Sequence, residues 1–347
     1  MLYRILDVNL NRAREALRVI EDYARFGLDN NYLSAEIKTL RHRLTSLIAS
    51  SRLSVINRQI IAGRDVMGDI GQRDFISRKR TIPDIITANF KRLEESLRSL
   101  AEYLKTAHPP TARQMEKLRF HAYELEQYFS FNLYPKRQLD KMRLYVLVSG
   151  SLSGRDSLQV IQSIIQGGAE AIQLREKGMP DNKLIKLIKE IRDITLRHKV
   201  LFIVNDRVDL AYLGRADGVH LGQDDISVRE ARQILGPDKI IGATTHQIEE
   251  ALAAEKNGAD YISVGPMFPT PLKPHLPADG FKYLPQVARQ IKIPYVAIGG
   301  INRLNIRKLI KIHKKLFDYP LKVAVSSGIM TRSDTKSATR ILKKIVP

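Results

Sequence analysis

The sequence predicts an α/β protein in which a (β/α)8 TIM barrel follows an all-α domain. Two observations predict this. Apolar residues recur every three or four positions over residues 1–135, whereas beyond Tyr134-Pro135 short apolar runs alternate with amphipathic stretches. The chain has 347 residues, a length suited to two domains that each bury a core of their own. We therefore expect a helical domain over residues 1–135 and a barrel domain over residues 140–347.

A duplicated helical hairpin accounts for the first domain. Ile5–Arg25 aligns with Ile85–Lys105, and each copy precedes a second helix that contains Leu-Arg, so the repeat covers residues 5–50 and 85–130. Four polar positions recur in both copies: Asn9, Arg12, Glu15 and Arg18, matched by Asn89, Arg92, Glu95 and Arg98. They form either an anion or partner site that occurs twice, or a ladder of surface ion pairs, which is the commoner use of such spacing.

Eight apolar runs account for the second domain. We expect strands at Leu144–Val148, Ala171–Leu174, Leu201–Val204, Gly218–Leu221, Ile240–Ala243, Tyr261–Val264, Tyr295–Ile298 and Val323–Val325. Helical stretches lie between them, such as Asn182–Lys199, Val228–Leu235, Ile248–Asn257 and Ile306–Lys315. Eight strand–helix repeats favour a closed barrel over an open sheet.

Composition excludes several classes of protein. The chain has no cysteine, which excludes disulfides, thiolate metal sites and a cysteine nucleophile. We find no secretory signal and no uninterrupted apolar run of about 18 residues, so we expect a cytoplasmic protein without membrane spans. The net charge of +20 is spread over both halves and lacks base-stacking motifs, so we expect small anionic metabolites rather than nucleic acid as partners.

Polar and glycine residues follow seven of the eight expected strands, where barrels build their active sites. Asp206 and Asp225 offer two carboxylates suited to Mg²⁺. Arg175 and Lys177 suit a diphosphate. The backbone amides of Gly299-Gly300 and Ser326-Ser327-Gly328 suit a single phosphate. The rim therefore predicts the joining of two phosphorylated metabolites, with diphosphate leaving.

Six motifs at these strand ends resemble those of thiamine-phosphate synthases in order and spacing. They cover roughly residues 142–345 and read QLREK, VND, HLGQDD, GPMFPTPLK, AIGGI and VSSG. The amino-terminal RILDVNLNRAREALRVIEDYARFGLD is similar to the extra domain of cyanobacterial-type members. The resemblance implies condensation of hydroxymethylpyrimidine diphosphate with hydroxyethylthiazole phosphate, which gives thiamine phosphate and diphosphate by Mg²⁺-assisted departure of diphosphate.

The resemblance also implies roles for individual residues. Residues implied to contact the pyrimidine diphosphate are Gln173, Leu174, Arg175, Glu176, Lys177, Asn205, Thr244 and Lys273, of which Arg175, Lys177 and Lys273 would be catalytic by stabilising the leaving diphosphate. Residues implied to hold the thiazole phosphate are Thr270, Pro271, Leu272, Gly300, Ser326 and Ser327. Asp206 and Asp225 would bind Mg²⁺, and Asp224 would face the adjoining loop. Leu272 departs from the family, which commonly has threonine there.

Two alternatives remain open at this point. A thiazole tautomerase-like barrel would need a positioned base and would not need the carboxylates and cations of the rim. An inactive phosphate-binding scaffold could instead use the helical domain to bind a protein partner or to self-associate. We expect His220, inside the fourth strand, to be a core or rim residue, and we assign no role to His246.

Overall fold

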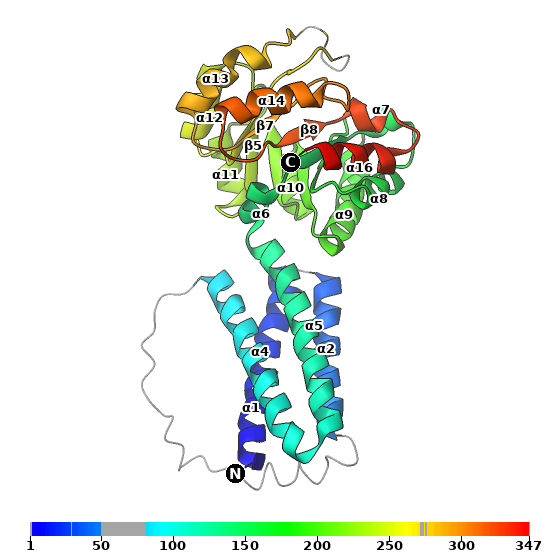
Figure 1. The fold of residues 1–347 in the computed structure, drawn as a ribbon, viewed down its shortest axis with the longest axis vertical. Coiled ribbons are helices and arrows are strands. Elements are labelled where there is room, and N and C mark those ends of the chain that lie inside the picture. Colours follow the sequence, from blue (N-terminus) through cyan, green and yellow to red (C-terminus); the bar gives the residue numbers. More distant parts are fainter. Residues whose placement is uncertain (1, 29, 50–80, 271–273, 275, 347) are drawn as a thin grey trace. The chain divides into compact units, whose positions relative to one another are not determined.

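The computed structural model describes residues 2–28, 30–49, 81–270, 274 and 276–346. It divides into two compact units, Met1–Leu133 and Tyr134–Pro347. The first unit is helical, and the second is an α/β barrel (Figure 1). The predicted fold class is therefore confirmed.

Long amphipathic helices build the first unit (Figure 1). They are α1 (Leu2–Asp22), continued by the π-helical turn η1 (Tyr23–Gly27), then α2 (Asn31–Ala49), α4 (Ile82–Ala107) and α5 (Pro109–Leu133). Helix α4 packs against both α1 and α5, while α2 packs against α5. The apolar stripe that the sequence predicts in α1, including Leu6, Leu10 and Leu17, is buried. This burial, rather than helix propensity, stabilises the bundle.

The sequence repeat has a local structural counterpart. The Asn9 side chain donates to the carbonyl of Ile5 at 2.9 Å, and Asn89 donates to the carbonyl of Ile85 at 2.8 Å. By contrast, the repeated charged residues of both copies are exposed: Arg12, Glu15, Arg18, Arg92, Glu95 and Arg98. The repeated asparagines therefore bond to their own helices, and the charged positions lie on the surface.

Eight parallel strands close the second unit into a barrel in sequence order, with β1 paired to β8. They are β1 (Leu144–Val148), β2 (Ala171–Leu174), β3 (Leu201–Asn205), β4 (Gly218–Leu221), β5 (Ile240–Thr245), β6 (Tyr261–Val264), β7 (Tyr295–Ala297) and β8 (Val323–Val325). The helices are α6 (Pro135–Lys141), α7 (Gly150–Ser153), α8 (Ser157–Gln166), α9 (Asp181–Arg197), α10 (Val208–Leu213), α11 (Val228–Leu235), α12 (Ile248–Lys256), α13 (Gly280–Gln290), α14 (Ile306–Leu316), α15 (Ser327–Met330) and α16 (Thr335–Ile345).

Alternation along each strand separates two layers of side chains. In β1, Leu144, Val146 and Val148 belong to the large core that includes residues of the surrounding helices. Tyr145 instead contacts Tyr261 of β6, a strand that is not its neighbour, so its side chain lies inside the barrel. Because successive strand residues point to opposite faces, polar residues at inward positions are directed into the barrel.

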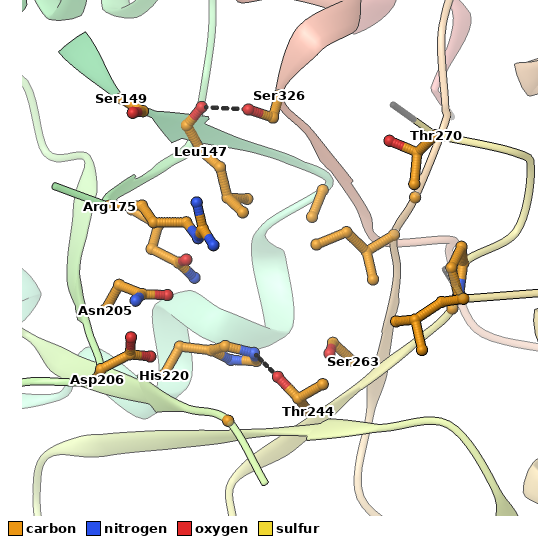
Figure 2. A pocket seen from close by; sticks show the side chains of 18 of the residues that line it. Leu147, Ser149, Arg175, Asn205, Asp206, His220, Thr244, Ser263, Thr270 and Ser326 are labelled. Carbon is orange, nitrogen blue, oxygen red and sulfur yellow. Dashed lines mark hydrogen bonds between the residues drawn. The ribbon is translucent and has the colours of Figure 1, made fainter. Parts of the chain in front are cut away.

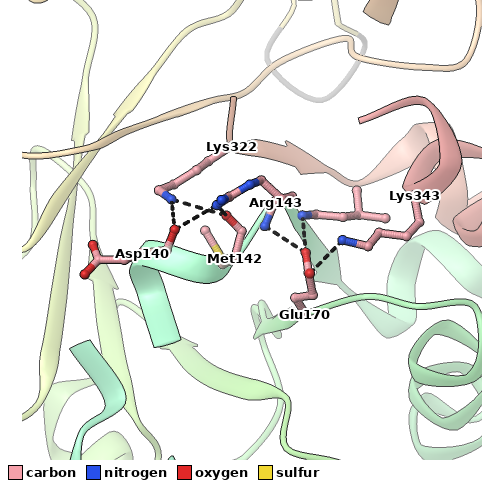
Figure 3. A network of polar contacts seen from close by, with 7 residues as sticks. Asp140, Met142, Arg143, Glu170, Lys322 and Lys343 are labelled. Atoms are coloured by element: carbon pink, nitrogen blue, oxygen red, sulfur yellow. Dashed lines mark hydrogen bonds and ion pairs between the residues drawn. The ribbon is translucent and has the colours of Figure 1, made fainter. Parts of the chain in front are cut away.

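A polar network fastens the amino-terminal end of the barrel (Figure 3). Lys322 and Arg143 both donate to the carbonyl of Asp140 at 2.7 Å, and Glu170 accepts from the backbone of Arg143 at 2.8 Å and from Lys343 at 2.6 Å. Burial lowers the pKa of Lys322 to about 8. Because these residues come before or beside the starts of β1, β2 and β8, the network lies opposite the carboxyl ends of the strands.

Among the residues that the structure describes, there is no helix long and apolar enough to cross a bilayer.

Candidate active site

A cavity of about 480 Å³ lies at the carboxyl ends of the barrel strands (Figure 2). This volume falls within the range that small-molecule sites occupy. Most of the residues singled out from the sequence line it together: Gln173, Arg175, Lys177, Asn205, Asp206, Asp225, Thr244, Thr270, Gly300, Ser326 and Ser327. The strand ends thus bring residues separated by more than 150 positions into one cavity.

Two of the proposed contact residues do not line this cavity. Leu174 packs into the core between the sheet and the helices. The Glu176 carboxylate accepts from the backbone N–H of Gly150 at 2.5 Å. Both follow from alternation, since Gln173 and Arg175 take the inward positions on either side of Leu174. Pro271, Leu272 and Lys273 lie outside the described residues, so their roles stay predictions from the sequence.

Asp206 and Asp225 form a pair of neighbouring carboxylates. Asp206 has a left-handed backbone, with φ of 62°, and its N–H donates to the carbonyl of His220 at 2.9 Å. Asp225 accepts from the N–H of Gly222 at 2.6 Å. Burial raises the pKa of Asp206 to about 6, and the neighbouring Asp225 raises it further, although Lys177 opposes the shift. Two carboxylates this close together repel each other when both are charged, so a cation bound between them would be favoured.

The donor set fits Mg²⁺. In the described part of the chain, no three His, Cys, Asp or Glu side chains gather as a complete metal cage. The site offers two hard carboxylate ligands, and Mg²⁺ commonly uses one or two carboxylates and takes its other ligands from water and substrate phosphate. The Lys177 ammonium, 3.8 Å from an Asp206 oxygen, would lie beside such a phosphate.

Cationic and amide side chains share one wall of the cavity with this pair. Figure 2 shows Arg175, Asn205 and Asp206 along the same side, with Thr270 across the cavity from them. The backbone of Arg175 is held by a 2.8 Å hydrogen bond from its N–H to the carbonyl of Val148. This bond fixes the start of the side chain, and its planar guanidinium is suited to bidentate binding of phosphate oxygens.

Two glycines shape the opposite wall. Gly299 and Gly300 have φ of 96° and 65°. A Cβ on Gly300 would lie 2.5 Å from the carbonyl oxygen of Pro269, and one on Gly299 would lie 2.5 Å from Pro266. Only glycine therefore allows this loop to pack against the loop that leads to Thr270.

The Ser326 hydroxyl donates its proton to the carbonyl of Leu147 at 3.1 Å, so this proton is not available to a ligand.

Several cavity residues were not assigned a role from the sequence. Ser149, His220, Gln223, His246 and Ser263 also line the cavity. His220 is 7% exposed, as expected of a core residue, yet it faces the site. The sequence pattern that could have revealed these residues is a polar residue at an inward position of an otherwise apolar strand. Burying such a side chain inside a barrel costs free energy unless it forms hydrogen bonds.

The closed parallel barrel and the position of its cavity define a (β/α)8-barrel enzyme. Residues 144–317 match the family of thiamine monophosphate synthases, and residues 4–128 match the ThiD2 family. The chain belongs to the thiamine-phosphate synthase family.

Curated relatives span both units. The chain is 38% identical to the thiamine-phosphate synthase of Thermosynechococcus vestitus over 98% of this chain and 94% of the relative. It is 37% identical to that of Nostoc punctiforme over 99% of this chain and 93% of the relative. Among solved structures, a thiamine phosphate pyrophosphorylase from Pyrococcus furiosus is 38% identical, has a TM-score of 0.53 and covers 59% of this chain and 96% of its own.

These similarities establish the chain as a transferase of thiamine biosynthesis that makes thiamine phosphate. Because the cyanobacterial matches cover nearly the whole chain, the helical unit is shared with those relatives. The predicted family and activity are confirmed, and the tautomerase-like and inactive-scaffold alternatives are set aside.

Proposed function

We propose that the chain condenses 4-amino-2-methyl-5-hydroxymethylpyrimidine diphosphate with hydroxyethylthiazole phosphate, giving thiamine phosphate and diphosphate. The observation that carries this proposal is one cavity with two walls of different chemistry. Asp206 and Asp225 lie near Lys177 on one wall, and the Gly299-Gly300 turn belongs to the other. One wall suits a metal diphosphate and the other suits a single phosphate.

Asp206 and Asp225 would hold Mg²⁺, which neutralises charge on the diphosphate when bound. Arg175 and Lys177 would bind the diphosphate oxygens directly, with Lys273 as a further cation proposed from the sequence alone. Asn205 and Thr244 would contact the same substrate. These side chains stabilise the leaving group most strongly when its charge is fully developed, so they accelerate the reaction as well as bind.

Bond cleavage precedes bond formation in this proposal. The C–O bond between the pyrimidinylmethyl carbon and the diphosphate breaks, and its electron pair leaves with the diphosphate. The thiazole nitrogen then gives its lone pair to the carbon and forms the C–N bond. No proton is transferred, so the reaction needs no general base, and the cavity walls serve to hold the carbon and nitrogen in line.

The second wall would hold the thiazole phosphate. Gly300 and Ser327 would contribute backbone N–H groups, while Thr270 would contribute its hydroxyl. Because the Ser326 hydroxyl donates to Leu147, Ser326 would also act through its backbone. Pro271 and Leu272 belong to this wall by the sequence resemblance alone.

We further propose the cytoplasm as the place of action and two small phosphorylated metabolites as the partners, without nucleic acid or membrane. The polar rim and the diffuse positive charge of the chain support small anionic metabolites as the partners. The helical unit stays a candidate surface for a protein partner or for self-association.

Steady-state kinetics of Arg175→Ala test the assignment of the diphosphate wall. We expect kcat/KM for the pyrimidine diphosphate to fall by about 10²–10³-fold, because one preorganised donor to the leaving group is lost. The KM for the thiazole phosphate should stay within about twofold, since the residues of the other wall that would bind this phosphate are unchanged. Arg229→Ala, at an exposed position of α11, is the control. Unchanged kinetics in Arg175→Ala would contradict the proposal.

A further inference from the structure

Arg207, which directly follows Asp206, binds two carboxylates at the rim of the barrel. Its Nη1 and Nη2 donate to the two carboxylate oxygens of Asp181 at 2.6 and 2.8 Å. Its Nε and Nη2 donate to the two carboxylate oxygens of Asp209 at 3.0 and 2.7 Å. Bidentate contacts of this kind are stronger and more directional than a single ion pair. They lower the pKa of both carboxyl groups, so both are charged at neutral pH.

The two contacts of Arg207 differ in what they join. Asp209 lies two positions further along the chain, in the first turn of α10, so this contact is local. Asp181 lies 26 positions earlier and begins α9. The contact with Asp181 therefore joins the loop between β3 and α10 to the end of the loop between β2 and α9. We call the pair Arg207–Asp181 the inter-loop bridge.

Arg207 is not placed to bind a substrate itself. It is absent from the described residues that line the cavity. Its contacts with the two carboxylates also occupy all but one of its N–H groups. Any effect of Arg207 on the reaction must therefore pass through the residues that it holds.

One residue that Arg207 holds is Asp206. The N–H of Arg207 donates to the carbonyl of Asn205 at 2.7 Å, which closes a three-residue turn with Asp206 at its centre and a φ of 62° there. Such a turn is rare and strained for a residue with a side chain, and it persists only where its surroundings hold it. The N–H of Asp206 is bonded to His220, and the inter-loop bridge holds the residue that closes the turn.

The other residue that depends on the bridge is Lys177. It lies in the loop between β2 and α9, four positions before Asp181, and its ammonium is 3.8 Å from an Asp206 oxygen. The Lys177 side chain is 65% exposed, so this ion pair is too weak to fix the two loops. The spacing between the Asp206 carboxylate and the Lys177 ammonium therefore depends on the inter-loop bridge.

We propose that Arg207 is a positioning residue for the diphosphate wall, because its bridge to Asp181 keeps the turn at Asp206 in place relative to the loop that carries Lys177. The inference rests on the proposed function for the substrate and the metal. Asp206 and Lys177 would bind one diphosphate from two different loops, the first through the cation and the second directly. Their spacing must therefore be set before the substrate arrives. The wall that would bind the thiazole phosphate does not depend on the bridge.

Kinetics of Asp181→Ala, with Asp209→Ala as a matched control, test this proposal. Each substitution removes an exposed carboxylate that binds Arg207 from the first turn of a helix, but only Asp181 joins the two loops. In Asp181→Ala we expect kcat/KM for the pyrimidine diphosphate to fall by about 10-fold, because the reacting groups are displaced. The Mg²⁺ concentration for half-maximal activity should rise, while the KM for the thiazole phosphate stays within about twofold.

A purely structural role for the bridge would not produce this selective pattern. Arg207→Lys keeps the charge and loses the planar fork, so it should behave as Asp181→Ala does. Asp209→Ala should stay within about twofold of wild type in every constant. Equal kinetics in Asp181→Ala and Asp209→Ala overturn the proposal.

Amide hydrogen exchange gives a second test that needs neither turnover nor metal. The N–H groups of Asp206 and Arg207 are both hydrogen-bonded in the fold. We expect the amides of residues 176–180 and 205–207 to exchange faster in Asp181→Ala than in Asp209→Ala, because loops that lose a tether open more often. Equal exchange in the two variants overturns the proposal. If the wild-type chain does not condense the two substrates, the proposed function fails instead, and hydrogen exchange still decides whether the bridge holds the loops.

Discussion

Asp206 combines a left-handed backbone with a carboxyl group whose negative charge is unfavourable in its surroundings. Its pKa of about 6 lies above the ordinary value of 3.8, because the group is partly buried and lies beside Asp225. A raised pKa in the folded state favours folding at low pH, and this contribution is lost as the pH rises through about 6. The carboxylate pair is therefore a local cost to stability at neutral pH that a bound cation would relieve.

Thermal unfolding of Asp206→Asn should separate this cost from function. Asparagine tolerates the left-handed backbone, so we expect the metal-free variant to be more stable than wild type by about 1–2 kcal/mol near pH 8, after allowance for solvent screening. Mg²⁺ should raise the melting temperature of wild type, more at pH 8 than at pH 5, and should leave the variant unchanged. Asp224→Asn, which changes an exposed residue of the same cavity, is the control. Equal Mg²⁺ stabilisation of all three proteins would rule out the metal assignment.

Individual site residues were predictable where the chain direction alone decides their position. Arg175, Asp206 and Ser326 follow strands directly, and parallel strands all end at one rim. The direction of the Glu176 side chain follows from alternation, but its hydrogen-bond partner was not predictable, since the N–H is donated by Gly150, 26 positions earlier. Sequence patterns describe which residues share a rim, whereas rotamers depend on neighbours distant in the chain.

At the scale of elements, strand boundaries followed closely from the apolar runs. Five of the eight strands match their predicted bounds, for example Tyr261–Val264. The fifth strand runs two residues further, to Thr245, whose hydroxyl donates to the carbonyl of Ser263 at 2.9 Å. Pairing of this kind between strands is not local, so an apolar run alone does not reveal it.

Helix α4 contains a buried acid that the amphipathic pattern did not reveal. Glu94 is 7% exposed, its Oε2 lies 3.1 Å from Lys91, and its Oε1 has no partner among the described residues. Burial raises the pKa of this carboxyl group. Lys91 also bonds to Glu126 at 2.8 Å, so it keeps a partner if Glu94 is changed.

We expect Glu94→Gln to stabilise the helical unit by about 0.5–1 kcal/mol at neutral pH, because a buried charge is removed while the shape is kept. Since the raised pKa favours the protonated form in the fold, wild type should approach the variant in stability as the pH falls. Circular dichroism of the full chain during thermal unfolding measures both effects. Glu95→Gln, at the exposed neighbouring position, should change little. Destabilisation by Glu94→Gln would mean that the bond to Lys91 outweighs the burial.

At the scale of the whole molecule, the described residues that line the cavity all belong to the unit Tyr134–Pro347. That unit has a closed sheet, a continuous core and the network around Lys322 at its amino-terminal end. The helical unit has a core of its own. The chemistry of thiamine phosphate formation therefore belongs to the barrel.

Residues 134–347 alone should form thiamine phosphate with kcat and both KM values within about twofold of the full chain, since the binding contacts are retained. Circular dichroism of the fragment confirms that it is folded before kinetics are measured. A folded but inactive fragment would show that the helical unit contributes to the site, and adding residues 1–133 should then restore activity.

The hydrogen bonds inside the barrel also bear on how its substrate could change. Gln173, Tyr145, Tyr261, His220 and Thr244 lie on five separate strands and are joined by hydrogen bonds, and Gly242 leaves space for the ring of Tyr261. Replacing one of these side chains leaves a buried neighbour without its partner, so a change of the cavity lining there would require coordinated replacements rather than a single step. Directed evolution of this enzyme toward other substrates should therefore begin with libraries that vary Gln173, Tyr145 and His220 together.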